Sequence, residues 1–541
     1  MKGLMQDWPL VVPSIIDHAY QTHGHREIVT RSVEGPFRRT TIAALHERAR
    51  MAAKGLSALG VKVGDRIATL AWNTDRHLEM WYGIMGIGAI CHTVNPRLFP
   101  EQIAYIINHA EDDYLFTDTT FLPILEAIQD KLPTIKKFFV LTDSANMPET
   151  TLRDAVCYED WLNQYDSDFD WVKFDENTAA GLCYTSGTTG NPKGVLYSHR
   201  SNVIHTLLAN SADAFGLTSM DCVLPVVPMF HANAWGLTFA VPSAGAKLVL
   251  PGMKMDGESL YELLEEEQVT ITAAVPTLWQ GLLHYLESTD KTLSSLKNVV
   301  IGGSACPQIM IEKFEQNYGV SVHHAWGMTE TSPIGTVYKI TPETAALSPE
   351  ELMKYKLKQG RNPYGVEMRI VDDAGQELPH DGVAFGHLMV RGPTIAASYF
   401  KGDGGQILDD DGWFDTGDVS TIDPLGYMQI TDRSKDVIKS GGEWISTIDI
   451  ENLTVAHPDV AEAAVIGRAH PKWDERPLLI VVPKKGATPA REEILAFLVG
   501  KIAKWWMPND VVFIDELPHT ATGKIQKMTL RDMFEDYEFP A

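Results

Sequence analysis

The segment Tyr184-Thr-Ser-Gly-Thr-Thr-Gly-Asn-Pro-Lys-Gly194 restricts the fold of this chain more than any other part of the sequence. Its glycines and short hydroxyl side chains disfavour both helix and strand. The composition predicts a loop whose backbone N–H groups and hydroxyls wrap an oligophosphate, with Lys193 as a point charge. Residues 177–183 are typical of a short buried strand, so we expect the loop at a strand end, where α/β proteins usually bind ligands.

Two other interpretations of this segment are weaker. A solvated linker rich in Gly, Ser and Thr seldom contains Pro-Lys-Gly and then resumes an apolar run, as this chain does at Val195. The segment also lacks the Gly-Lys-Ser/Thr ending of a Walker loop, which argues against an ordinary ATPase or GTPase.

Length and charge exclude several classes of protein. A chain of 541 residues is too long for one core, so two or more domains are expected. The net charge of −25 argues against nucleic acid or an anionic membrane as a partner. No signal peptide or membrane span is recognisable, and the five cysteines form no Cys-x-x-Cys pair. We therefore expect a cytoplasmic protein with reduced thiols and no cysteine-ligated zinc.

Over the first 300 residues, segments with helical spacing alternate with short β-rich runs. Helices are expected at 41–59, 100–110 and 257–268, and strands at 66–71, 137–141, 246–250 and 298–301. This alternation predicts layered α/β architecture with largely parallel sheets.

From about residue 364 the pattern changes to short strands separated by turns. Strands are expected at 367–371, 386–390 and 427–430. These segments predict a small β-rich subdomain over about 364–431, at the end of a large N-terminal region that spans 1–431.

The charged stretch 432–436 is the candidate hinge before a compact α+β unit that spans 437–541. In this unit helices are expected at 449–456 and 489–504, and strands at 460–467, 477–482 and 511–513. The chain is therefore predicted to be an α/β multidomain protein with a small α+β C-terminal domain.

Three further segments carry candidate site residues. In Asp415-Thr-Gly-Asp418 a carboxylate on a tight turn can accept hydrogen bonds from vicinal hydroxyls, as in ribose recognition, although a solvated turn is the simpler reading. The segment 324–330 follows a predicted strand at 320–323 and ends in Thr329, which can contact a phosphate, and Glu330, which can bind Mg²⁺. Trp326 either stacks on a purine or packs in the core. The glycines of 302–306 would let a flat ligand lie against the backbone.

Five segments occur in a fixed order: 184–194, 324–330, 414–418, 432–439 and 518–525. With them the chain resembles, over essentially its whole length, the adenylate-forming superfamily of acyl-CoA synthetases, luciferases and peptide-synthetase adenylation domains. The resemblance implies that the small C-terminal domain is mobile. It also implies two half-reactions, in which a carboxylic acid and ATP give an acyl-adenylate and pyrophosphate, and a thiol then takes the acyl group. ATP, Mg²⁺ and coenzyme A are the implied cofactors and co-substrates.

The resemblance assigns roles to matching positions. The phosphates would be held by the loop residues Thr185, Ser186, Gly187, Thr188, Thr189, Gly190 and Lys193, and the metal by Thr185 and Glu330. Thr185, Glu330 and Lys524 would be the catalytic residues, with Lys524 bridging carboxylate and phosphate during adenylation. Residues around the nucleotide would be Gly303, Ser304, Ala325, Trp326, Gly327, Met328 and Thr329, with Asp418 and Arg433 at the ribose. Lys435 matches the hinge position of the superfamily, and Lys439, Gly441, Gly442 and Glu443 would line the approach of the thiol.

The segment Pro228–Gly236 matches the part of the superfamily beside the acyl pocket, where Trp235 resembles the gate tryptophan of some fatty-acyl ligases. The implied pocket residues are His231, Trp235, Gly302, Gly303 and Cys306. No charged side chain is evident to pair with a charged tail, so an uncharged short- or medium-chain acid is expected. The segment also resembles that of ligases for 3-methylmercaptopropionate, a thioether acid.

Several alternatives stay open at this point. A long-chain fatty-acid ligase has a similar sequence, and the adenylate could instead load a carrier protein or enter an oxidation. Coenzyme A is the favoured acceptor, because no carrier domain with its Ser-bearing helix follows the C-terminal unit. A non-catalytic nucleotide-binding protein is disfavoured, because Lys193, Glu330 and Lys524 are all present. Members of the superfamily are often homodimers, which makes a homodimer one candidate assembly.

Overall fold

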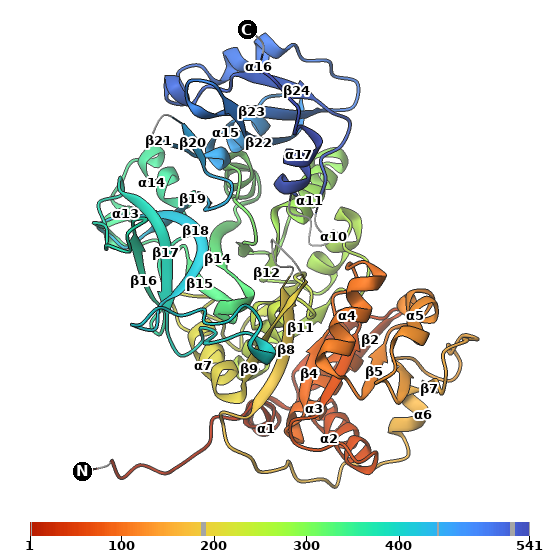
Figure 1. The fold of residues 1–541 in the computed structure, drawn as a ribbon. Coiled ribbons are helices and arrows are strands. Elements are labelled where there is room, and N and C mark those ends of the chain that lie inside the picture. The colour runs from red at the N-terminus through yellow and green to blue at the C-terminus, as the bar shows by residue number, and fades with distance from the viewer. Residues whose placement is uncertain (2, 186–190, 441–442, 520–524, 540–541) are drawn as a thin grey trace.

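The computed structural model describes residues 1, 3–185, 191–440, 443–519 and 525–539 (Figure 1). For residues 439, 443 and 444 it describes the backbone alone. The predicted site residues Ser186, Gly187, Thr188, Thr189, Gly190, Gly441, Gly442 and Lys524 lie outside the described residues.

A seven-stranded sheet is built from the first third of the chain, in the order β7-β6-β5-β3-β4-β8-β9. All neighbouring strands are parallel except β8 and β9, which pair antiparallel. The strands are β3 (Arg66–Leu70), β4 (Ile90–Thr93), β5 (Tyr114–Thr117), β6 (Lys137–Val140), β7 (Val156–Cys157), β8 (Ala179–Thr185) and β9 (Lys193–Ser198). The accompanying helices include α2 (Ile42–Ala58), α3 (Asp75–Gly86), α4 (Pro100–Ala110), α5 (Leu122–Ile128), α6 (Tyr158–Leu162) and α7 (His199–Ala209). The parallel, layered arrangement predicted from the sequence is confirmed.

A second sheet has eight strands, in the order β15-β14-β13-β12-β10-β11-β1-β2, and takes its strands β1 and β2 from the N-terminal part of the chain. Its six central strands are parallel, and the edge strands β2 and β15 are antiparallel. The strands are β1 (Glu27–Arg31), β2 (Phe37–Thr41), β10 (Cys222–Pro225), β11 (Lys247–Leu250), β12 (Ile271–Ala274), β13 (Asn298–Ile301), β14 (Ser321–Gly327) and β15 (Ile334–Val337). The helices include α1 (Val12–His23), α9 (Leu237–Ala244), α10 (Gly257–Glu266), α11 (Pro276–Thr289), α12 (Gln308–Glu312), α13 (Pro342–Ala345) and α14 (Pro349–Lys356).

The two large sheets share one hydrophobic core. Every residue of α3 is buried, and this helix packs in a cluster with Ile67 from one sheet and Val223 from the other. The hydroxyl of Tyr82 in α3 donates to the main-chain oxygen of Thr238 in α9 at 3.0 Å. Burial of so much apolar surface between the sheets fixes the strand ends that carry the candidate site.

The predicted β-rich subdomain is an antiparallel sheet in the order β16-β17-β18-β19. Its strands are β16 (Glu367–Val371), β17 (Phe385–Arg391), β18 (Phe414–Ile422) and β19 (Met428–Arg433). A β-segment is expected directly after Asp418, but β18 begins earlier and includes the Asp415–Asp418 segment, which has the composition of a turn.

The C-terminal unit contains a five-stranded sheet of β20 (Ile438–Ser440), β21 (Glu443–Ile445), β22 (Val460–His470), β23 (Asp474–Pro483) and β24 (Asp510–Phe513). Its helices are α15 (Thr447–Val455), α16 (Arg491–Leu498) and α17 (Lys527–Met533). The helix expected at 489–504 is shorter than predicted, because Val499 is extended and Gly500 adopts a left-handed φ of 79°. This unit forms one end of the molecule, at the top of Figure 1.

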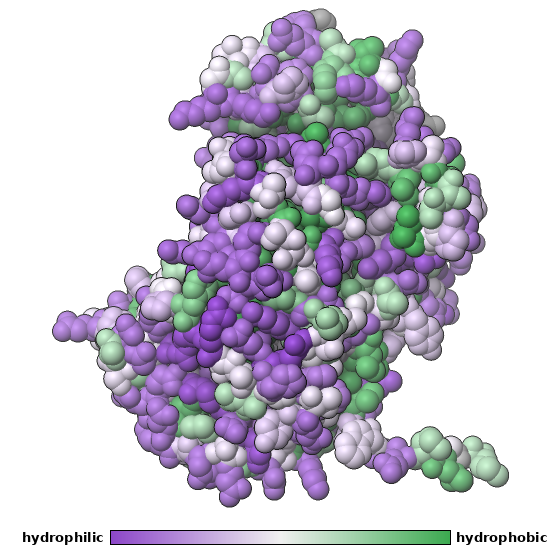
Figure 2. Space-filling view, turned by 180° about the vertical axis from the view of Figure 1, so that it is seen from behind, coloured by the Kyte–Doolittle hydropathy of each residue, from purple (hydrophilic) through white to green (hydrophobic). Residues whose placement is uncertain are grey.

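The α/β multidomain class is thus confirmed, whereas the domain limits stay predictions. Residues 432 and 433 of the candidate hinge belong to β19, so the regular sheet continues into the predicted hinge. At the other end of the chain, an N-terminal segment extends from the body (Figures 1 and 2); residues 3–9 are exposed, among them Leu4, Met5 and Trp8. None of the helices in the described ranges is long and apolar enough to cross a membrane.

Candidate active site

Trp326 lies on a strand rather than beyond one. The strand expected at 320–323 continues to Gly327, because β14 pairs antiparallel with β15 and sets Trp326 opposite Thr336. The indole is buried in the core of the β-rich sheet, and a Cβ on Gly335 would come within 2.2 Å of it. The indole N–H donates to Oδ2 of Asp418 at 2.8 Å. Trp326 therefore combines core packing with a polar contact to the predicted ribose residue.

Asp418 is held from two sides. It is only 2% exposed, and the antiparallel register of β18 and β19 sets it opposite Arg433. Nε of Arg433 lies 2.8 Å from Oδ1, while Oδ2 accepts from Trp326. Each carboxylate oxygen can accept a second hydrogen bond, so two acceptor positions are left for vicinal hydroxyls. This arrangement fits the predicted role at the ribose.

Glu330 lies in a short 3₁₀ turn, η4 (Thr329–Thr331), that follows β14. The side chain is buried and Oε1 accepts from the hydroxyl of Tyr399 at 2.7 Å. The main chain of the turn is held as well, because the hydroxyl of Tyr197 donates to the oxygen of Thr329 at 2.8 Å. The turn therefore presents one buried carboxylate in a fixed position.

Thr185 and Lys193 mark the two ends of the glycine-threonine segment. They are paired across β8 and β9, which brings the ends of the loop together. Nζ of Lys193 lies 4.9 Å from the ring centroid of Tyr399. Lys193, at the start of β9, and Glu330, in η4, thus both contact Tyr399.

The donor set suits a magnesium ion that travels with a nucleotide. Within the described ranges there is no group of three or more His, Cys, Asp or Glu side chains that could hold a metal. Mg²⁺ is commonly held by one or two carboxylates together with substrate phosphates and water. Glu330 fits this pattern, because Oε2 makes no hydrogen bond to another described residue.

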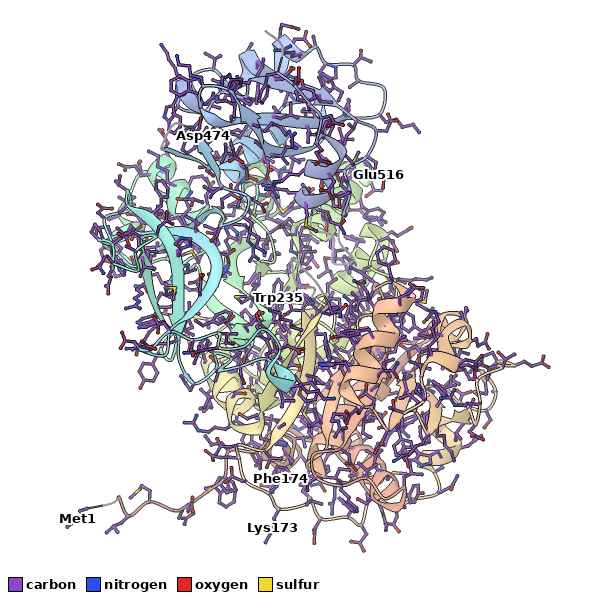
Figure 3. The ribbon with its side chains drawn as sticks, viewed as in Figure 1. Met1, Lys173, Phe174, Trp235, Asp474 and Glu516 are labelled. Atoms are coloured by element: carbon purple, nitrogen blue, oxygen red, sulfur yellow. The ribbon has the colours of Figure 1, made fainter. Side chains whose placement is uncertain are left out.

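The predicted acyl-pocket residues Trp235 and Gly302 come together. A Cβ on Gly302 would lie 3.2 Å from the Trp235 ring and 3.0 Å from the main-chain oxygen of Ala325. Figure 3 places Trp235 near the middle of the molecule. Gly303 adopts a left-handed φ of 84°. Only a small residue at 302 can leave the indole where it lies.

An unusual backbone turn holds Trp235 in place. The residues of α8 (Ala232–Trp235) all have positive φ, from 43° to 59°, and Gly236 continues the left-handed path at 79°. Such a conformation costs about 1–2 kcal/mol for each non-glycine residue, so it persists only where the surroundings enforce it. A Cβ on Gly236 would come within 2.5 Å of the His205 ring. Burial lowers the pKa of His205 to about 3, so this ring is neutral and its Nε2 accepts from the N–H of Ile334 at 3.2 Å.

The remaining predicted site residues differ in burial and in the elements that carry them. Cys306 is 1% exposed and packs in the core cluster of Met310 and Ile311, so a place in the acyl pocket stays a prediction. His231 is half-buried at the start of α8, and Ser304 is exposed. Ala325, Gly327 and Met328 follow the course of β14 toward η4, and Lys435 has its main-chain oxygen bound by Arg531 at 3.1 Å. Lys439 and Glu443 lie on the adjacent strands β20 and β21.

The ends of the segment that carries Lys524 are drawn together. His519 and Ile525 form an antiparallel bridge, and the N–H of Gln526 donates to the oxygen of Pro518 at 2.8 Å. The role of Lys524 stays a prediction.

Three site residues were missed in the sequence. Tyr197, His205 and Tyr399 contact Thr329, Gly236 and Glu330, respectively, from positions far away in the chain. None of them belongs to a recognisable motif, and their proximity depends on how the sheets pack.

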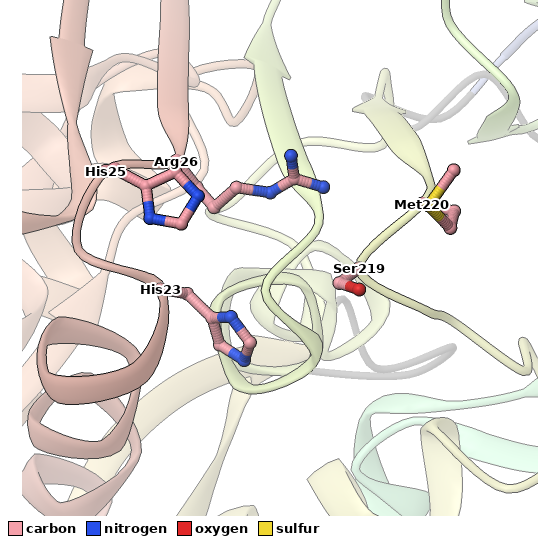
Figure 4. A pocket seen from close by; sticks show the side chains of 5 residues that line it. All are labelled: His23, His25, Arg26, Ser219 and Met220. Carbon is pink, nitrogen blue, oxygen red and sulfur yellow. The ribbon is translucent and has the colours of Figure 1, made fainter.

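A hollow of about 310 Å³ lies apart from these residues, beside the end of α1 (Figure 4). It is lined by His23, His25, Arg26, Ser219 and Met220. None of the predicted site residues contributes to it.

The chain matches two models of one protein family. Residues 16–400 match the AMP-binding enzyme model, and residues 449–524 match the AMP-binding enzyme C-terminal domain. The protein therefore belongs to the AMP-binding enzyme family, as the resemblance to adenylate-forming proteins predicted.

Named relatives cover nearly the whole chain. A 3-methylmercaptopropionyl-CoA ligase of Ruegeria lacuscaerulensis is 52% identical over 99% of both chains. A medium-chain-fatty-acid–CoA ligase of Ectopseudomonas oleovorans is 48% identical over 99% of this chain and 98% of its own. Among solved structures, the anthranilate CoA ligase AuaEII in complex with anthranoyl-AMP is similar with a TM-score of 0.87 and 26% identity, over 98% of this chain and 99% of its own.

Proposed function

We propose that this protein is an AMP-forming ligase that joins an uncharged short- or medium-chain carboxylic acid to coenzyme A, with 3-methylmercaptopropionate as the favoured acid. The observation that carries the activity is the arrangement of three family residues: Asp418 lies between two donors, and Glu330 and Lys193 both contact Tyr399. The choice of acid is supported by 52% identity to a 3-methylmercaptopropionyl-CoA ligase over 99% of the chain.

In the first half-reaction an oxygen of the acid attacks the α-phosphorus of ATP, the bond to the bridging oxygen breaks, and pyrophosphate leaves. Asp418 orients the ribose, and Lys193 with the glycine-threonine loop holds the departing phosphates. Lys524 neutralises charge between the carboxylate and the α-phosphate. Because three groups of negative charge meet here, fixed positive charge stabilises the transition state.

We also propose that Glu330 and the hydroxyl of Thr185 hold a Mg²⁺ ion. When bound, it neutralises charge on the phosphates. The proposal is supported by the free Oε2 of Glu330 among the described residues and by the position of Thr185 at the mouth of the loop.

In the second half-reaction the sulfur of coenzyme A attacks the acyl carbon, the bond to the phosphate oxygen breaks, and AMP leaves. We propose that Lys439-Ser-Gly-Gly-Glu443 lines the approach of the thiol and that the hinge at 432–436 lets the C-terminal domain rotate between the steps. The acid lies beside Trp235, whose ring covers Gly302 and limits the chain length.

We further propose a cytoplasmic enzyme that forms a homodimer. The proposed compartment is supported by five cysteines that are all unpaired and buried. The proposed assembly is supported by the resemblance to a superfamily with frequent homodimers.

A panel of acids tests the function. The protein is assayed with ATP, Mg²⁺ and coenzyme A against 3-methylmercaptopropionate, butyrate, octanoate and palmitate, and AMP and the thioester are measured together. We expect equal amounts of AMP and thioester, with the highest kcat/KM for the thioether acid. Preference for palmitate would overturn the proposed acid and support a long-chain ligase. Pyrophosphate release without any acylated coenzyme A would contradict coenzyme A as the acceptor and would favour a carrier protein in its place.

A further inference from the structure

We propose that residues 394–404, here called the strap, position the two phosphate-facing groups Glu330 and Lys193, and that Tyr399 is the positioning residue that joins them. The strap connects β17 to β18 and includes the 3₁₀ turn η5 (Phe400–Gly402). The proposal rests on the proposed function, because it concerns how the same nucleotide site is assembled.

The first part of the strap is tied to the turn that carries Glu330. The N–H of Ala396 donates to the main-chain oxygen of Glu330 at 2.8 Å, and the hydroxyl of Ser332 donates to the main-chain oxygen of Thr394 at 2.7 Å. These two bonds fix the strap and the turn relative to each other without any contribution from the side chains of Tyr399, Glu330 or Lys193.

Tyr399 extends from this anchored segment to both functional groups. Its hydroxyl donates to Oε1 of Glu330 at 2.7 Å, and its ring faces Nζ of Lys193 at 4.9 Å. Burial raises the pKa of the Tyr399 phenol above its usual range, and the nearby charge of Glu330 raises it further. The phenol therefore keeps its proton and acts as a hydrogen-bond donor. With Oε1 fixed in this way, Oε2 is directed to other ligands.

The far end of the strap also lies close to Lys193. A Cβ on Gly404 would lie 2.6 Å from Nζ of Lys193, and Gly404 has a left-handed φ of 77°. A glycine at 404 thus meets two requirements, because other residues are strained at this φ and would displace the ammonium group. Nζ of Lys193 thus lies close to both the Tyr399 ring and Gly404.

The strap is also tied to the start of the glycine-threonine segment. Nε2 of His109 lies 3.6 Å from a carboxylate oxygen of Asp403, and Nδ1 of the same ring lies 2.7 Å from the hydroxyl of Tyr184. The strap is therefore linked to the beginning of the phosphate segment through His109, and through Tyr399 it contacts both the lysine and the carboxylate. A segment with these contacts can set their mutual positions.

Packing alone is the competing explanation, since Tyr399 also lies against the small cluster of Cys183, Val195 and Tyr197. Two variants separate the roles. Tyr399→Phe keeps the ring below Lys193 and removes the donor to Glu330, whereas Tyr399→Leu removes both. Tyr82→Phe is the matched control, because it removes another buried tyrosine hydroxyl that binds main chain, at Thr238 in the shared core and not at the turn that carries Glu330.

The decisive measurement is binding without turnover. Mn²⁺ binding to the enzyme–ATP complex is followed by electron paramagnetic resonance in the absence of any acid, and ATP binding without metal is followed by calorimetry. Loss of a hydrogen bond to a charged group weakens an interaction about 10-fold or more, so Tyr399→Phe is expected to weaken Mn²⁺ binding by about that factor. Metal-free ATP binding is expected to stay unchanged in Tyr399→Phe and to fall in Tyr399→Leu. Tyr82→Phe is expected to melt at a lower temperature and to bind Mn²⁺ normally.

Normal Mn²⁺ binding by Tyr399→Phe would overturn the proposal, whatever its melting temperature, and so would the absence of Mn²⁺ binding in the unaltered enzyme–ATP complex. If the unaltered protein converts none of the acids and the Tyr399→Phe effect is still observed, the proposed ligase function fails while the role of the strap stands. If the acids are converted and Tyr399→Phe binds Mn²⁺ normally, the proposed ligase function stands while the role of the strap fails.

Discussion

The indole N–H of Trp326 donates to Asp418 across 92 positions of sequence, at a distance of 2.8 Å. This bond joins β14 of the eight-stranded sheet to the β-rich sheet, at the carboxylate that we propose binds the ribose. Since Arg433 occupies the other oxygen, Asp418 is oriented before any nucleotide arrives. Preorganisation of this kind lowers the cost of ordering the site on binding.

Removing the indole donor is expected to weaken ATP binding. In Trp326→Phe, Asp418 loses one of its two donors, and a hydrogen bond to a charged group contributes about 1.5–3 kcal/mol. The KM for ATP should rise about 10-fold or more in steady-state assays, while the KM for coenzyme A stays close to that of the unaltered enzyme. An unchanged KM for ATP in a folded variant would contradict the proposed role of this pair.

The contact between Trp235 and Gly302 is expected to set the length of the acid. Trp235→Ala should extend activity to longer chains, because it removes the ring that lies over Gly302. Gly302→Ala is the opposite change, because the added Cβ would meet both the Trp235 ring and the main-chain oxygen of Ala325. This variant should have a lower kcat/KM for all acids. Profiles of kcat/KM over acids of increasing length test both variants. An unaltered profile for Trp235→Ala would show that the indole does not limit chain length.

The two half-reactions are expected to respond differently to Lys524→Ala. The superfamily resemblance assigns Lys524 to adenylation alone, so the variant should lose acid-dependent pyrophosphate release. It should still form thioester from coenzyme A and a synthetic acyl-adenylate. Equal loss of both steps would argue against rotation of the C-terminal domain between them.

A buried carboxyl that is not among the proposed site residues predicts a pH dependence of stability. Asp118 is 1% exposed and accepts from the N–H of Trp72 at 2.6 Å. Burial raises its pKa to about 7, above an unfolded value of about 3.9. The folded state then holds a proton that the unfolded chain releases, so the free energy of unfolding falls as pH rises from about 4 to about 7.

Asp118→Asn should remove this contribution, because the amide oxygen still accepts from Trp72 and does not titrate. The effect is worth at most about 1.4 kcal/mol for each pH unit between the two pKa values. Melting temperatures of both proteins at pH 5 and pH 8 check the sign. Relative to the unaltered protein, the melting temperature of the variant should be higher at pH 8 than at pH 5. A difference in melting temperature that does not change with pH would contradict the raised pKa.

Local signals in the sequence predicted much of the secondary structure. The helix at 100–110 was predicted with its observed limits, because Pro100 suits the first helical position and the apolar spacing is regular. The helix at 489–504 was predicted too long, because the break depends on Gly500 in a left-handed conformation that spacing does not reveal. The strand through Trp326 was predicted too short, because its extension depends on pairing with β15.

Site residues were predictable where a motif carries them and not where packing brings them together. Asp418, Glu330 and Lys193 belong to motifs with recognisable chemistry. Tyr399 is 69 positions from Glu330 in the chain, and only the folded strap brings its hydroxyl to that carboxylate. The left-handed turn before Gly236 was likewise not predictable from the sequence, since alanine and tryptophan do not favour positive φ.

An acyl-adenylate intermediate is tested most directly by exchange of labelled pyrophosphate into ATP. With 3-methylmercaptopropionate and Mg²⁺ but without coenzyme A, we expect label to enter ATP, because adenylation is complete and reversible before the thiol reacts. Addition of coenzyme A should then convert the bound intermediate to thioester and AMP in equal amounts. Exchange that requires coenzyme A, or release of ADP and phosphate in place of AMP and pyrophosphate, would contradict the proposed reaction.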